Sequence, residues 1–183
     1  MAKLPNQYQW LLNEDGPKMI KEALALIDVK EDLSVKNNPT IMDWAKEVGG
    51  NVANVYLADS IPWCGLFMAV VAKRAGKLFN FNPLWALSWA GFGEHIENPE
   101  LGDVLVFTRT TPDGKLAGHV ALYVGEDAEH YHCLGGNQTD KVCIQRKKKT
   151  RLYKAVRPQY NNKPANIRRV FLMNTGEVSN SEQ

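Results

Sequence analysis

Apolar positions recur every three to four residues through the first half of the chain, which predicts a series of helices. Met19, Ala23 and Ile27, for example, fall on one helical face. Asn38 followed by Pro39 has the residue types of a helix start, because an asparagine side chain caps free N–H groups and a proline suits the first turn. The predicted helices cover residues 17–27, 38–49, 61–76 and 82–93.

The pattern changes after Gly102 to short apolar runs that are rich in β-branched and aromatic residues. A turn signal, "PDG" at 112–114, separates the first two runs. Consecutive strands on short turns predict an antiparallel sheet, so we expect an α+β fold with the N-terminal helices packed on it. The predicted strands cover residues 103–109, 119–125, 129–136, 141–147 and 151–156, and residues 167–172 are a candidate edge strand.

The chain has 183 residues and a net charge of +2, which suits one domain and gives no indication of a nucleic-acid partner. We expect the domain to cover residues 1–157 and a polar, partly disordered tail to cover 158–183. The first twenty residues contain no continuous apolar run, and no stretch is long and apolar enough to span a bilayer. We therefore expect synthesis in the cytoplasm without a signal peptide, reduced cysteines and no stable membrane insertion.

Cys64 is the first candidate for chemistry, since the predicted helix places it in a first turn. Free N–H groups and the positive end of the helix dipole favour a thiolate there and can hold an oxyanion. The competing interpretation is a small buried hydrophobe, because Phe67, Met68 and Val71 share its helical face.

A thiolate nucleophile needs a base, and His119 opens an apolar strand where it can line a cleft. His95 lies in a polar loop. His130 and His132 share one strand face, but with Cys133 and Cys143 they fit no standard ligand spacing. We therefore expect no metal and no other cofactor.

The base in turn needs a polar partner that fixes its tautomer. Asn137 and Gln138 in "LGGNQTD" are candidates, although Gly-Gly-Asn is also ordinary turn chemistry. His132 is the other candidate.

The order of these segments resembles the CHAP and NlpC-type cysteine peptidoglycan hydrolases of the papain-like superfamily. The resemblance covers about residues 17–145. It is carried by "NNPTIMDW", "IPWCGLFMAVVAKRAG", "ALSWAGFG", "LGDVLVF", "GHVALYVGED" and "YHCLGGNQTD".

The resemblance implies a papain-like fold in which Cys64 is the nucleophile and His119 the general base. Asn137 best matches the third polar residue of CHAP members, and His132 lies nearer the NlpC-type position. The implied substrate is a peptidoglycan amide, either muramoyl–L-alanine or a bond in the stem peptide or cross-bridge. Candidate substrate-binding residues are Trp63, Trp85, Trp89, His132 and Gln138.

Two other functions stay open. One is a catalytically silent wall-binding or phage structural module on the same fold, and the other is a transglutaminase-like or deamidase activity on a protein. The expected place of action is the cell wall, in the periplasm or outside the cell, after release or injection. The partner would then be a holin, an immunity protein, or a component of a virion or secretion machine.

Overall fold

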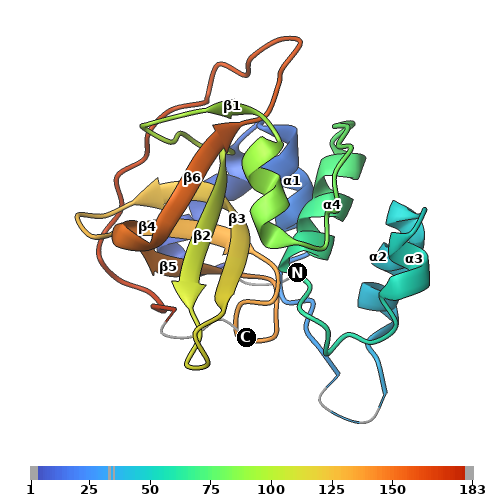
Figure 1. Ribbon diagram of the computed structural model, residues 1–183. Coiled ribbons are helices and arrows are strands. Elements are labelled where there is room, and N and C mark those ends of the chain that lie inside the picture. The colour runs from blue at the N-terminus through green and yellow to red at the C-terminus, as the bar shows by residue number, and fades with distance from the viewer. Residues whose placement is uncertain (1–3, 33, 35, 180–183) are drawn as a thin grey trace.

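Six antiparallel strands form one sheet in the order β1-β6-β2-β3-β4-β5 (Figure 1). The structure, a computed structural model, describes residues 4–32, 34 and 36–179. It confirms the predicted α+β class and the antiparallel sheet. The strands are β1 (Glu94–His95), β2 (Val104–Thr110), β3 (Leu116–Glu126), β4 (His130–Gly135), β5 (Cys143–Lys148) and β6 (Leu152–Arg157).

Most of the helices precede the sheet in sequence, as predicted. Asn38 caps α2 through its side-chain oxygen, which accepts from the Thr40 N–H at 2.8 Å. The predicted helix at 82–93 is only a short 3-10 turn, because Pro83 and the glycines interrupt it. The helical elements are η1 (Asn6–Asn13), α1 (Lys18–Leu24), α2 (Pro39–Val48), α3 (Val52–Val55), α4 (Cys64–Arg74), η2 (Ala86–Gly91) and η3 (Lys149–Arg151). None of the described helices has the length and apolar character that crossing a bilayer requires.

Helix α4 lies at the centre of the helical layer, packed against β3 on one side and against α1 and α2 on others (Figure 1). Every residue from Cys64 to Ala72 is buried. A helix that is apolar on all sides has no single core face. Burial of Cys64 therefore does not distinguish a structural thiol from a catalytic one.

The central strands are buried on both faces, with side chains alternating between two clusters. Val120, Leu122 and Val124 of β3 belong to the cluster that includes the helices. Ala121 and Tyr123 belong to a second cluster on the other face. His119 begins this buried part of β3, opposite Phe107 of β2.

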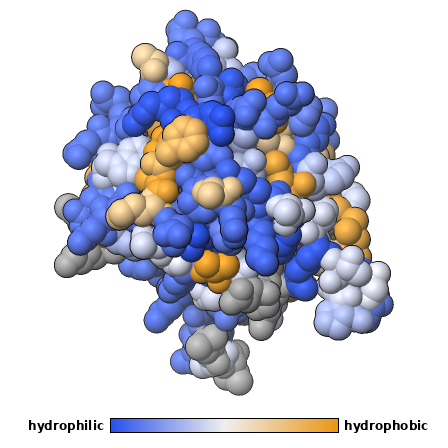
Figure 2. Space-filling model, turned by 90° about the vertical axis from the view of Figure 1, so that its left-hand side faces the viewer, coloured by the Kyte–Doolittle hydropathy of each residue, from blue (hydrophilic) through white to orange (hydrophobic). Residues whose placement is uncertain are grey.

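The C-terminal segment, residues 158–179, runs back along the domain. The Val170 carbonyl accepts from the Glu126 N–H at 2.8 Å, and the Glu177 carbonyl accepts from the Arg146 N–H at 2.8 Å. Residues 167–172 form a single bridge to β3 rather than a strand. The face over which this segment passes is mostly hydrophilic, with small separate apolar patches (Figure 2). Residues 180–183 of the predicted tail lie outside the described residues.

Candidate active site

Cys64 is the first residue of α4 and is 6% exposed. The Phe67 N–H donates to the Trp63 carbonyl at 2.9 Å, which makes Trp63 the residue that precedes the first helical turn. In such a turn the leading N–H groups have no acceptor within the helix. These groups and the helix dipole favour negative charge at Cys64 and at any oxyanion beside it.

Gln138 is the hydrogen-bond partner of His119. Its Oε1 lies 3.1 Å from His119 Nε2, and both side chains are buried. Its Nε2 donates to the Cys133 carbonyl at 3.1 Å and to the Cys143 carbonyl at 2.6 Å. The reverse amide orientation would set Oε1 against two carbonyl oxygens, so these two bonds fix which amide atom faces His119.

This fixed amide also determines the tautomer of His119. Because Oε1 of Gln138 can only accept, His119 Nε2 must carry the proton and donate it. In the neutral imidazole, Nδ1 then carries the lone pair. Nδ1 is therefore the nitrogen of His119 that can accept a proton from a thiol.

Two chain segments connect residues next to Cys64 with residues next to His119. Gly136 packs so closely on the first turn of α4 that an added Cβ would lie 2.7 Å from Trp63 and 2.5 Å from Phe67. Gln138, which holds His119, is only two residues further along. The segment from Gly136 to Gln138 therefore joins the start of α4, where Cys64 lies, to His119.

The second segment is Pro83–Leu87, at the start of η2. A Cβ on Gly65 would lie 2.2 Å from the Pro83 carbonyl oxygen, and one on Gly118 would lie 2.8 Å from Leu87. Gly65 directly follows Cys64, and Gly118 directly precedes His119. Both glycines permit a close approach that a side chain would block.

Asn137, the predicted orienting residue, is 6% exposed and has a left-handed φ of 54°. Its Oδ1 has no hydrogen-bond partner among the described residues. Gln138, a candidate both for orienting the base and for binding substrate, makes the bond to His119 that the resemblance assigned to Asn137. The residue that binds His119 does lie in "LGGNQTD", but it is Gln138, one residue after the Asn137 that the resemblance implied.

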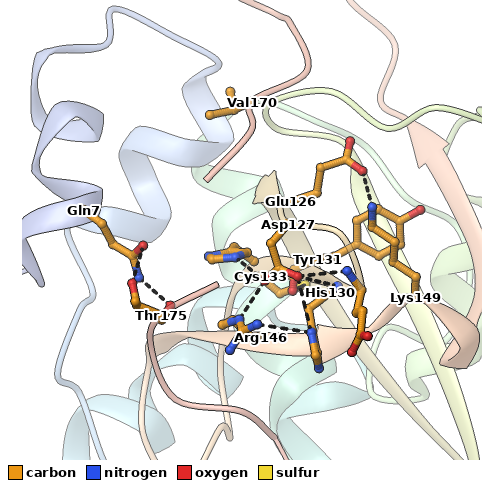
Figure 3. Close-up of polar contacts among 12 residues, drawn as sticks. Gln7, Glu126, Asp127, His130, Tyr131, Cys133, Arg146, Lys149, Val170 and Thr175 are labelled. Atoms are coloured by element: carbon orange, nitrogen blue, oxygen red, sulfur yellow. Dashed lines mark hydrogen bonds and ion pairs between the residues drawn. The ribbon is translucent and has the colours of Figure 1, made fainter. Parts of the chain in front are cut away.

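His132, the other predicted orienting residue, pairs with Gly125 near the opposite end of β3 and belongs to a separate buried cluster. Figure 3 shows Asp127, His130 and Arg146 of this cluster. Its Nδ1 lies 2.7 Å from the Tyr8 hydroxyl, and its Nε2 lies 3.0 Å from Asp127 Oδ2. Both ring nitrogens are thus engaged, and neither is bound to His119. The structure brings His119 together with Gln138 and not with His132.

Asp127 is the centre of this second cluster. It also accepts from Arg146 Nε at 2.7 Å and from the backbone N–H groups of Glu129 and His130. Although burial opposes ionisation, these bonds hold the pKa of the Asp127 carboxyl well below its usual range. Arg146 and Lys147, which begin the basic run 146–151, are buried.

The three tryptophans proposed for substrate binding differ sharply. Trp63 is fully buried and donates from Nε1 to Glu31 at 2.7 Å. Trp89 is fully buried and donates from Nε1 to the Pro83 carbonyl at 3.0 Å. Trp85 alone of the three is exposed.

Two surface hollows, of about 400 and 420 Å³, lie beside the segment that leads into α2, and neither is lined by Cys64 or His119. Both are bordered by Glu31 and Asp32, and Glu31 is the residue bound to Trp63. Burial raises the pKa of Glu31. A larger hollow, of about 690 Å³, is lined by Arg157 and Tyr160 and lies away from this chemistry. Within the described residues, no grouping of histidine, cysteine and carboxylate side chains is arranged to hold a metal ion.

Comparison with known proteins adds no assignment. No family model matches the chain, and no curated protein or solved structure matches it significantly. The functional assignment therefore rests on the geometry around Cys64, His119 and Gln138.

The tautomer of His119 is open to direct test by ¹⁵N NMR of the imidazole ring. We expect the neutral ring to be protonated at Nε2 in the wild-type protein and to become a mixture of tautomers in Gln138→Ala. Asn137→Gly, which tolerates the left-handed φ and removes the neighbouring amide, should leave the ring pattern unchanged. An Nδ1-protonated ring in the wild type, or a change in Asn137→Gly alone, would contradict the assignment.

The His132 cluster should make stability depend on pH. Burial lowers the pKa of His132, and Asp127 opposes this only in part, with His130 and Arg146 adding repulsion. On acidification through its ordinary pKa of about 6.5, the unfolded chain takes up a proton that the folded protein does not, so stability falls. We expect the unfolding free energy, measured in urea, to fall from pH 7.5 to 5.5.

The matched variant is His132→Gln, which removes the titrating group. It should be less stable at pH 7.5 but lose less on acidification than the wild type. An equal loss in both proteins would show that other groups cause the pH dependence.

Proposed function

We propose that the protein is a cysteine-dependent hydrolase of peptidoglycan amide bonds on a papain-like fold. The observation that carries the proposal is the clamped Gln138 amide, which holds His119 Nε2 as a donor and belongs to the segment packed on the start of α4. A thiol and a histidine with purely structural roles would not require this arrangement. The sequence resemblance supplies the substrate class.

The chemistry follows from the residues in place. His119 Nδ1 takes the Cys64 proton, and the resulting thiolate attacks the amide carbonyl carbon. N–H groups at the start of α4 stabilise the oxyanion. The imidazolium, stabilised by Gln138 Oε1, gives its proton to the leaving amine as the C–N bond breaks. Water, deprotonated by His119, then hydrolyses the thioester and restores the thiol.

Digestion of purified sacculi tests this function. The wild-type protein should release soluble fragments, and mass spectrometry of their new ends should identify the bond cut. Cys64→Ala should reduce release by at least about 10³-fold, because the nucleophile is lost. Cys143→Ser, which keeps a hydrogen-bond donor to the Gln138 carbonyl and the backbone carbonyl that holds Gln138, should retain most of the activity.

The contrary result is equally specific. If the wild type releases no more than Cys64→Ala from several wall chemistries, the hydrolase proposal fails. Binding to sacculi without release would favour the silent wall-binding module.

A further inference from the structure

Trp85 is far more exposed than the other tryptophans. Its side chain is 60% exposed, whereas Trp44, Trp63 and Trp89 are almost fully buried. Trp10 is half-buried and is covered by Arg168, whose guanidinium carbon lies 5.5 Å from the ring. An indole offers a large apolar face at little conformational cost, so exposed tryptophans are frequent binding anchors.

The position of Trp85 connects it with the candidate active site. It lies between Leu84, whose carbonyl group is 3.0 Å from the Cβ position of Gly65, and Ala86, which is 3.2 Å from that of Gly118. These two glycines adjoin Cys64 and His119. From Trp85 through Leu84 and Gly65 to Cys64, the backbone path is roughly 12 Å.

The support beneath Trp85 is buried and well packed. The Pro83 carbonyl is held by Trp89 Nε1 at 3.0 Å. Trp89 in turn packs against Phe79, Phe81 and Phe92, with ring centroids 4.8 to 5.6 Å apart. A platform fixed in this way binds without first having to become ordered.

We propose that Trp85 stacks on a pyranose ring of the glycan strand, an inference that rests on the proposed function. The C–H edges of a pyranose are weakly positive and fit the negative face of an indole. The stem peptide carries no aromatic ring, so the sugar is the flat, partly apolar partner that this substrate offers. Because the path from Trp85 to Cys64 is only roughly 12 Å, a sugar stacked on Trp85 favours a scissile amide near the glycan strand over one in a cross-bridge.

Calorimetric titration of the Cys64→Ala protein with peptide-free glycan strands tests this contact without turnover. We expect measurable binding that weakens about tenfold when Trp85→Ala is added and less when Trp85→Phe is added. Tyr153→Ala, which removes an equally exposed aromatic ring from β6, is the matched control and should leave binding unchanged. Binding of free stem peptide should be the same with and without Trp85.

Kinetics with soluble disaccharide-peptides complete the test. In the otherwise wild-type enzyme, Trp85→Ala should raise KM about tenfold and change kcat by less than about twofold. Hydrolysis and glycan binding that do not respond to Trp85 would overturn this inference and leave the proposed function standing. Trp85-dependent glycan binding without any hydrolysis would overturn the proposed function and leave the glycan contact standing. Cleavage confined to a cross-bridge would also overturn the inference.

Discussion

The candidate site depends on one side-chain amide. Gln138 donates to the Cys133 and Cys143 carbonyls, so its oxygen has a single orientation and faces His119. The two carbonyls belong to β4 and β5, so the register of the sheet determines where the amide sits. To act as a base, His119 must be protonated at Nε2 and unprotonated at Nδ1. Strand pairing fixes this tautomer through Gln138, so it does not depend on a flexible surface contact.

His132, near the other end of β3, is also held in one tautomer by its partners, but the consequence differs. His132 is held by Asp127 and Tyr8, and these two partners leave no lone pair for chemistry. The cluster instead ties together η1, β4 and β5, and the backbone of Arg146 continues it to the C-terminal segment (Figure 3). In His119 the lone pair lies on Nδ1, away from the nitrogen that Gln138 holds, whereas both nitrogens of His132 bind Tyr8 and Asp127. This difference supports a candidate catalytic role for His119 and a structural role for His132.

Much of the architecture could be predicted from the sequence because hydrophobic period and turn residues are local signals. Such signals predict the helix that carries Cys64 in its first turn, the Asn38 cap and the five main strands. The choice among Asn137, Gln138 and His132 could not be predicted, since it depends on which carbonyls and carboxylates the sheet brings near each side chain. Burial of Trp63 and Trp89 is likewise a tertiary property, and only the packing of α4 and η2 separates them from exposed Trp85.

The most direct test of the account is the rate of iodoacetamide modification of each cysteine at pH 7, followed by peptide mass spectrometry. Cys64 should react faster than cysteine in solution and faster than Cys133 or Cys143. The Cys143 thiol should be slow, because burial raises its pKa to about 11. The account also predicts that Gln138→Ala slows modification of Cys64, since the thiolate depends on a correctly held His119. If Cys64 reacts no faster than free cysteine, with or without Gln138, the central claim is wrong.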